Sequence, residues 1–338
     1  MFMPNAFKGL LYGLGITTAV NEYESTLSRA NENRDYHIYE GLGLALIKQV
    51  QPLYSKVRLE YLYQQDRDMF ALDSTTISCS INLMSWAMGK YSKGAVNMHT
   101  LIDLRGSIPI FMDITDGRYH DSNILDKLNV VANAIYTMDK AYVDFEALSR
   151  IDKEYGFFVT RAKDNMKYDI ITSNFNIDEQ SGLRGDHSIR LTGYKSSKLY
   201  PKILRLVEYS DIESGEKLLF ITNMYDCLEL NGLEIAEIYR HKWDIESFFK
   251  LIKQNLTIKH MLGCSENAVN THLWITIYAY LLLAKVKALY DSPYSITEIG
   301  TLIKVYALVK TDLKTLVTTP QPLIQNQDFK ELTLFDIF

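Results

Sequence analysis

Three acidic residues, far apart in the sequence, are the side chains best suited to chemistry. Asp73 and Asp139 each lie toward the C-terminal end of an apolar, β-like stretch, and Glu246 lies in a stretch with helical apolar spacing. Carboxylates on strand ends and on a helix are the hard oxygen ligands that select Mg²⁺ or Mn²⁺. Two such ions can activate an attacking oxygen and stabilise the leaving one in phosphodiester cleavage. The three residues therefore indicate a metal-dependent nuclease site.

Glu246 belongs to a single helix that we predict over residues 231–255, opened by a capping box of Asn231 and Glu234. At about 100° per residue, one face of this helix collects a tyrosine, a glutamate and several cations. These residues are Tyr239, Lys242, Glu246, Lys250 and Lys253. Lys253 would lie about 10 Å along the axis from Glu246, which suits a grip on the next phosphate of a bound strand.

Ordinary structural roles could also explain these residues. A lone aspartate at a strand end is often a turn or cap residue, and Lys and Glu commonly form a solvated helix face. Trp243 is more typical of a core residue than of a platform for a nucleobase. Lys93 and His99 could approach DNA, although a hydrogen-bonded strand histidine is the commoner role. Other aspartates in comparable places could be the real ligands: Asp103, Asp113, Asp116 and Asp121.

The elements that must position the acidic residues are those of an α/β fold. Strands are predicted at 69–77, 95–104 and 107–115, then a helix at 121–133, a strand that ends at Asp139, a helix, and a strand at 156–163. This order predicts a mixed sheet with Asp73 and Asp139 on neighbouring strands. Four further β-like runs between residues 166 and 229 exceed what a strand-to-helix connection needs, so we expect an inserted all-β subdomain.

Composition predicts a large folded chain in a reducing compartment. The 338 residues are 47% apolar and 12% aromatic, which is enough for a large core. A net charge of −5 argues against nucleic-acid binding by the whole surface, but residues 239–260 form a basic patch. Three cysteines without a CxxC pair indicate no disulfide frame and no zinc site. The apolar run at 273–284 is too short to cross a bilayer and predicts a buried helix, with no membrane partner.

Several blocks resemble the DDE transposases of bacterial insertion sequences, in the IS-four family with its YREK signature. Tyr239, Lys242, Glu246 and Lys253 match the pattern Y-x2-R-x3-E-x6-K. The segments LDST, YSKGAVNMHTLIDLRG, DITDGRYHDSN, MDKAYVDFEAL and the final ELTLFDIF also resemble blocks of that family, in the same order. The likeness extends from about residue 25 to the C-terminus.

The resemblance implies a ribonuclease-H-like catalytic core interrupted by a β-rich insertion. It implies cleavage at the ends of a DNA element, joining of the 3′-hydroxyl ends to target DNA, and a homodimer in the synaptic complex. Asp73, Asp139 and Glu246 would hold two Mg²⁺ or Mn²⁺ ions. Residues expected to contact DNA phosphates are Tyr239, Lys242, Lys253, Arg240, Lys250, Lys93, His99, Arg161 and Lys163. We expect a cytoplasmic bacterial protein, associated with the nucleoid when it is bound to DNA.

The same reasoning predicts domain boundaries. Residues 1–66 form a helical N-terminal region, and residues 67–165 with 230–290 form the catalytic core. Residues 166–229 form the insertion, and residues 291–338 form a C-terminal helical segment and tail.

The chain also departs from the family pattern. Lys242 replaces the signature arginine, which keeps the charge but loses the bidentate fork. Asn97 stands where relatives carry a lysine, and Lys140-Ala141 replaces an Arg-Gly pair. From the resemblance we also expect much of the usual N-terminal DNA-binding region to be missing. Two alternatives to a transposase therefore stay open. One is a truncated copy that acts only as a DNA-binding or dimerising regulator, and the other is a stand-alone metal-dependent nuclease.

Overall fold

The computed structural model describes residues 26, 29–30, 32–55, 67–79, 94–174, 181–212, 214–225, 230–255, 265–307 and 309–319. The chain forms two compact units, one made of Met1–Tyr54 with Leu251–Phe338 and the other of Ser55–Lys250. This division separates residues 230–250 from residues 251–290, which the sequence predicts to share one domain. The domain boundaries expected from the sequence remain a prediction. Two of the three cysteines, Cys227 and Cys264, lie outside the described residues.

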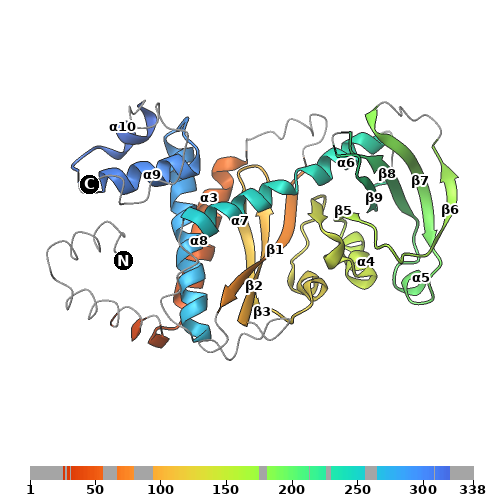
Figure 1. Ribbon diagram of the computed structural model, residues 1–338, viewed down its shortest axis with the longest axis horizontal. Helices are drawn as coiled ribbons and strands as arrows, with labels where there is room; N and C mark the ends of the chain where they lie inside the picture. Colours follow the sequence, from red (N-terminus) through yellow and green to blue (C-terminus); the bar gives the residue numbers. More distant parts are fainter. Residues whose placement is uncertain are drawn as a thin grey trace. The chain divides into compact units, whose positions relative to one another are not determined.

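The Ser55–Lys250 unit is built on a nine-stranded mixed sheet with the order β3-β2-β1-β4-β5-β9-β8-β7-β6 (Figure 1). β1 is antiparallel to β2 and parallel to β4, and β4 is parallel to β5. The strands are β1 (Met69–Cys79), β2 (Gly94–Asp103), β3 (Ile108–Asp116), β4 (Ile135–Met138), β5 (Phe157–Arg161), β6 (Tyr168–Ser173), β7 (Leu183–Leu191), β8 (Leu204–Ser210) and β9 (Lys217–Thr222). The first five strands have the ribonuclease-H-like arrangement, which confirms the predicted fold class.

The short strand β4 is buried on both faces of the sheet. All four of its residues are buried, including Thr137, whose hydroxyl donates to the carbonyl oxygen of Phe70. The helix α4 (Phe145–Lys153) follows β4, and Asp144 caps it by accepting hydrogen bonds from the backbone N–H groups of Glu146 and Ala147. A continuous apolar core runs from β1 and β4 through α4 to β8.

β6 to β9 occupy the stretch where we predict a β-rich insertion, and they extend the same nine-stranded sheet. β9 pairs with β5, and β8, β7 and β6 follow outward to the sheet edge (Figure 1). A buried ion pair joins β7 to β8: Arg205 donates two hydrogen bonds to Asp186, at 2.8 and 2.7 Å. Arg205 also donates to the carbonyl oxygen of Leu230, just before the next helix. The short helix α5 (Ser196–Leu199) lies in the β7–β8 connection.

The single helix predicted over 231–255 is wrong, because the structure divides it into α6 (Gly232–Arg240) and α7 (Trp243–Asn255). Around the break, the backbone N–H groups of Lys242, Asp244 and Ile245 each donate to the carbonyl oxygen three residues earlier. This tightening is typical of a 3₁₀ turn. The predicted capping box of Asn231 and Glu234 is present at the start of α6.

The other unit contains α3 (His37–Tyr54), α8 (Glu266–Leu289), α9 (Ile296–Tyr306) and α10 (Leu313–Thr318). The backbone N–H of Tyr36, just before α3, donates to Asn267 Oδ1 near the start of α8, and the Tyr54 hydroxyl at the end of α3 donates to the carbonyl oxygen of Ala284 toward the end of α8. The two helices therefore pack in parallel. α8 has 24 residues, longer than the predicted apolar run, and by length and composition alone it could cross a membrane. Because it packs along α3 and 44% of its most apolar window is buried, this is weak support for a membrane span.

Candidate active site

Two of the predicted acidic residues lie side by side at the centre of the sheet. Leu72 on β1 and Met138 at the end of β4 are register partners in a parallel pair, so Asp73 on β1 and Asp139 directly after β4 are the next residues along. The backbone N–H of Ser74 donates to Asp73 Oδ1 at 2.8 Å, and the N–H of Lys140 donates to Asp139 Oδ1 at 2.6 Å. Asp139 thereby caps the short 3₁₀ helix η4 (Lys140–Tyr142). Local backbone bonds thus orient both carboxylates.

The end of α6 and the turn after it supply one partner for each aspartate. Lys242 Nζ donates to Asp73 Oδ2 at 2.7 Å, in an ion pair whose side chains are only 7% and 19% exposed. Tyr239 is buried, and its ring centroid lies 4.8 Å from that of Phe220. Burial, followed by the charge of Asp139, raises the pKa of Tyr239 well above its usual range. Tyr239 therefore stays a neutral hydroxyl beside Asp139.

Glu246 lies in the first turn of α7, one turn beyond Lys242, and its side chain is exposed. Within the described part of the chain, no three His, Cys, Asp or Glu side chains converge closely enough to hold a metal ion. The donor set nevertheless suits a hard cation, since Asp73 on β1 lies beside Asp139, which directly follows β4, and Asp73 already binds a positive charge. The role of Glu246 as a metal ligand remains a prediction.

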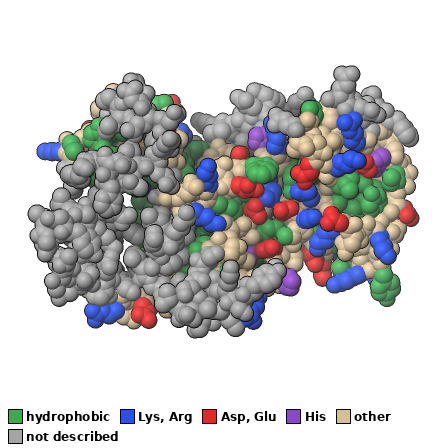
Figure 2. Space-filling view, in the orientation of Figure 1, with side chains coloured by type: hydrophobic (Ala, Val, Ile, Leu, Met, Phe, Trp, Pro, Cys, Tyr) green, Lys and Arg blue, Asp and Glu red, His purple; other side chains and the backbone are tan. Residues whose placement is uncertain are grey.

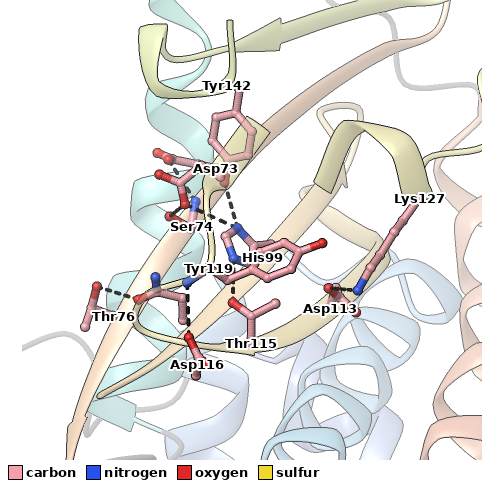
Figure 3. A network of polar contacts seen from close by, with 12 residues as sticks. Asp73, Ser74, Thr76, His99, Asp113, Thr115, Asp116, Tyr119, Lys127 and Tyr142 are labelled. Atoms are coloured by element: carbon pink, nitrogen blue, oxygen red, sulfur yellow. Dashed lines mark hydrogen bonds and ion pairs between the residues drawn. The ribbon is translucent and has the colours of Figure 1, made fainter. Parts of the chain in front are cut away.

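Beside Asp73, a buried polar network surrounds His99 (Figure 3). His99 on β2 is the cross-strand partner of Ser74, and its side chain is completely buried. Its Nδ1 lies 3.1 Å from the hydroxyl of Tyr142 and its Nε2 lies 3.0 Å from the hydroxyl of Thr115. Burial lowers the pKa of His99, although the nearby charge of Asp121 opposes the shift. A contact between His99 and DNA, as expected from the sequence, is excluded in this structure because the ring is not accessible.

This network connects the two aspartates through their neighbours in sequence. Tyr142 ends η4, the turn that Asp139 caps, while Ser74 follows Asp73 on β1. The Ser74 hydroxyl lies 3.5 Å from Asp121 Oδ1, and Asp121 opens the 3₁₀ helix η3 (Asp121–Lys127). Ser74 and Tyr142 were not predicted as site residues from the sequence. The one signal available for them was that each lies within three positions of an aspartate in the sequence.

The alternative aspartates mostly have structural partners. Asp103 is buried and binds Arg105, Asp113 binds Lys127, and Asp116 accepts from the backbone of the following turn. Asp121 differs from these three because its carboxylate lies next to Ser74, the residue that follows Asp73. The core role predicted for Trp243 is wrong, because its side chain is 63% exposed at the start of α7.

The other predicted DNA contacts are scattered. Arg240 is exposed and pairs with Glu237, Lys250 is exposed, Arg161 pairs with Glu216, and Lys163 donates to the carbonyl oxygen of Val143. Lys253 belongs to the other unit and Lys93 lies outside the described residues, so the roles of both stay predictions. Acidic and basic side chains intermingle on the face shown in Figure 2, which differs from the continuous positive surface of many DNA-binding proteins.

Comparison with known proteins decides the family. Residues 64–282, well over half of the chain, match the family model described as "Transposase DDE domain". The chain belongs to this family. The match confirms the predicted DDE transposase class, and it spans both aspartates and Glu246.

Curated relatives of this DDE transposase carry transposase names. Over 216 residues it is 32% identical to putative transposase y4zB of Sinorhizobium fredii, covering 63% of this chain and 59% of that protein. It is 28% identical to the probable transposase for insertion sequence element IS5377 of Geobacillus stearothermophilus, covering 88% and 74%. It is 27% identical to the putative transposase for IS4SA of Synechocystis, covering 77% and 70%. These names agree with the insertion-sequence resemblance.

One solved structure, a piggyBac transposase synaptic complex with hairpin DNA, matches 77% of this chain and 59% of that one. The TM-score is 0.42 at 11% identity, and the assignment does not depend on it.

Proposed function

We propose that this chain cleaves DNA at the ends of an insertion sequence and transfers the 3′-hydroxyl ends into target DNA. The observation that carries the proposal is the adjacent placement of Asp73 and Asp139, each contacted from the end of α6 or the turn after it. Family membership supports the same reaction class.

Divalent metal is the proposed cofactor, with Asp73, Asp139 and Glu246 as its ligands. Their oxygens suit Mg²⁺ or Mn²⁺, and two such ions would activate the attacking oxygen and stabilise the leaving one. Asp73 and Asp139 would be held in place by the backbone N–H groups of Ser74 and Lys140. Glu246, exposed on α7, would complete the set by a change of side-chain conformation or a movement of the helix.

Double-stranded DNA, both terminal repeats and target, is the proposed partner, bound by a homodimer. Arg240 and Lys250 are exposed and could contact phosphates without rearrangement. Lys242 and Tyr239 are buried against the aspartates, so each would have to move to reach a phosphate. The proposed location is the cytoplasm, at the nucleoid when the protein is bound to DNA.

Nicking of a duplex that carries the terminal repeat tests this function. The wild type should nick in Mg²⁺ and not in EDTA, and Glu246→Gln should abolish nicking. Because Glu246 is exposed, this change should alter stability by less than about 0.5 kcal/mol. Asp244→Asn, which removes a charge from the same helical turn, is the matched control and should retain nicking. Equal nicking by the wild type and Glu246→Gln would remove Glu246 from the chemistry.

The regulator alternative gives a different outcome in the same assay. A chain that only binds element ends would shift the terminal-repeat duplex in a gel but leave it intact in Mg²⁺. Inverted repeats and a target duplication around the gene would favour a mobile element over a remnant.

A further inference from the structure

We propose that Lys242 is a built-in competitor of the divalent metal: its ammonium occupies Asp73 in the metal-free protein and leaves when metal binds. This inference rests on the proposed metal site. It concerns Asp73 alone, because the group placed beside Asp139 is the neutral hydroxyl of Tyr239.

The ion pair is more enclosed than a surface contact. Lys242 is buried, and the side chain of Asp73 is 19% exposed. Lysine is rarely buried unless it is paired. In the described part of the protein, the hydrogen bond seen for the Lys242 ammonium is the one to Asp73. The position of this side chain therefore depends on that carboxylate.

Both oxygens of Asp73 are already engaged. Oδ2 accepts from Lys242 at 2.7 Å, and Oδ1 accepts from the backbone N–H of Ser74 at 2.8 Å. A Mg²⁺ ion binds carboxylate oxygen at about 2.0–2.1 Å. A divalent ion that binds Oδ2 would therefore lie beside the ammonium in a half-buried site, where like charges repel strongly. Metal binding must displace Lys242 or be weakened by it.

Lys242 is held by the turn between α6 and α7 and not by the interior of a helix. Lys242 precedes α7, on the two-residue turn where the helical hydrogen bonding changes register. Once displaced, its ammonium is free to bind a phosphate. Metal and DNA would then favour each other's binding, because coupling between two ligands is reciprocal.

Titration of the DNA-free protein with Mn²⁺, followed by electron paramagnetic resonance, tests the competition. Lys242→Met should bind Mn²⁺ more tightly than the wild type, by on the order of tenfold, a usual size for coupled sites. Arg240→Met removes an equal charge two residues away from an exposed position paired with Glu237, and it should leave the affinity within about twofold, since exposed charges couple weakly. Asp73→Asn should lose the binding.

The direction of the change separates competition from a structural role. If Lys242 only stabilised the fold, its loss would leave Mn²⁺ affinity unchanged or weaker. Thermal unfolding without metal verifies that each variant is folded, and Lys242→Gln replaces Lys242→Met if the latter is not. An unchanged or weaker affinity in a folded variant overturns the inference while the proposed function stands. If neither the wild type nor the variant binds Mn²⁺, both fail.

Discussion

Tyr239 at the end of α6 and Lys242 on the turn after it lie beside different aspartates: Lys242 donates to Asp73, and the Tyr239 hydroxyl lies beside Asp139. Tyr239 contributes both a ring, which packs against Phe220, and a hydroxyl beside Asp139. The two contributions can be separated by substitution.

Tyr239→Phe should preserve the fold and impair the chemistry. The ring contact with Phe220 remains, so the free energy of unfolding should change by about 1 kcal/mol or less, the usual net value of one hydrogen bond. The nicking rate should fall, because Asp139 loses its hydroxyl partner. Tyr239→Ala should cost about 3 kcal/mol or more. Urea unfolding and single-turnover nicking measure the two effects, and a nicking rate unchanged in Tyr239→Phe would show that the hydroxyl plays no part.

His99 should make stability depend on pH. Burial lowers its pKa in the folded state, whereas in the unfolded chain it titrates near 6.5. Below about pH 6.5 the unfolded state therefore binds a proton that the folded state does not, so stability falls as the pH falls toward the folded-state pKa. Above that pH the contribution is constant. Urea unfolding between pH 5 and 7.5 should show a shallower decline in His99→Gln, and parallel curves would contradict the assignment.

Residue types could be predicted from sequence better than their surroundings could. Apolar runs predict strand ends at Asp73 and Asp139. The structure confirms this for Asp139, which directly follows β4, but β1 continues to Cys79, so Asp73 lies within its strand. The burial of His99 and the exposure of Trp243 depend on packing from elements far away in sequence. Neither follows from the local pattern of residues.

The β-rich extension depends on the buried ion pair between Arg205 and Asp186. Because their side chains are only 3% and 6% exposed, removing one partner leaves a buried charge without compensation. Arg205→Met should lower the free energy of unfolding by about 3–5 kcal/mol.

The double variant Arg205→Met/Asp186→Leu should recover much of that loss, since it removes both charges. Urea denaturation measures each variant. A loss below about 1 kcal/mol in the single variant would mean that the pair behaves like a surface contact.

The break between α6 and α7 shows a limit of reasoning from helical periodicity. Apolar spacing is similar across a continuous helix and across a helix with one tightened turn, so residues 231–255 could not reveal the break. The ion pair between Lys242 and Asp73 spans 169 positions of sequence, and no local pattern encodes it.

At the scale of the whole molecule, the net charge of −5 means that DNA binding must depend on a few local cations. Lys253→Ala should weaken binding to the terminal-repeat duplex and reduce the salt slope by about 0.9, the value for one phosphate contact. Lys217→Ala, which removes an exposed charge from β9, is the control and should leave the slope unchanged. Fluorescence anisotropy at several salt concentrations measures the slope, and equal slopes for all three proteins would place Lys253 outside the DNA interface.

The most direct test of the metal site is a crystal structure of the protein soaked in Mn²⁺, with anomalous scattering used to locate the ions. We expect an anomalous peak within coordination distance of Asp73 and Asp139, with Glu246 turned toward it and Lys242 withdrawn from Asp73. Strong peaks elsewhere, with the Lys242–Asp73 pair unchanged, would contradict the account.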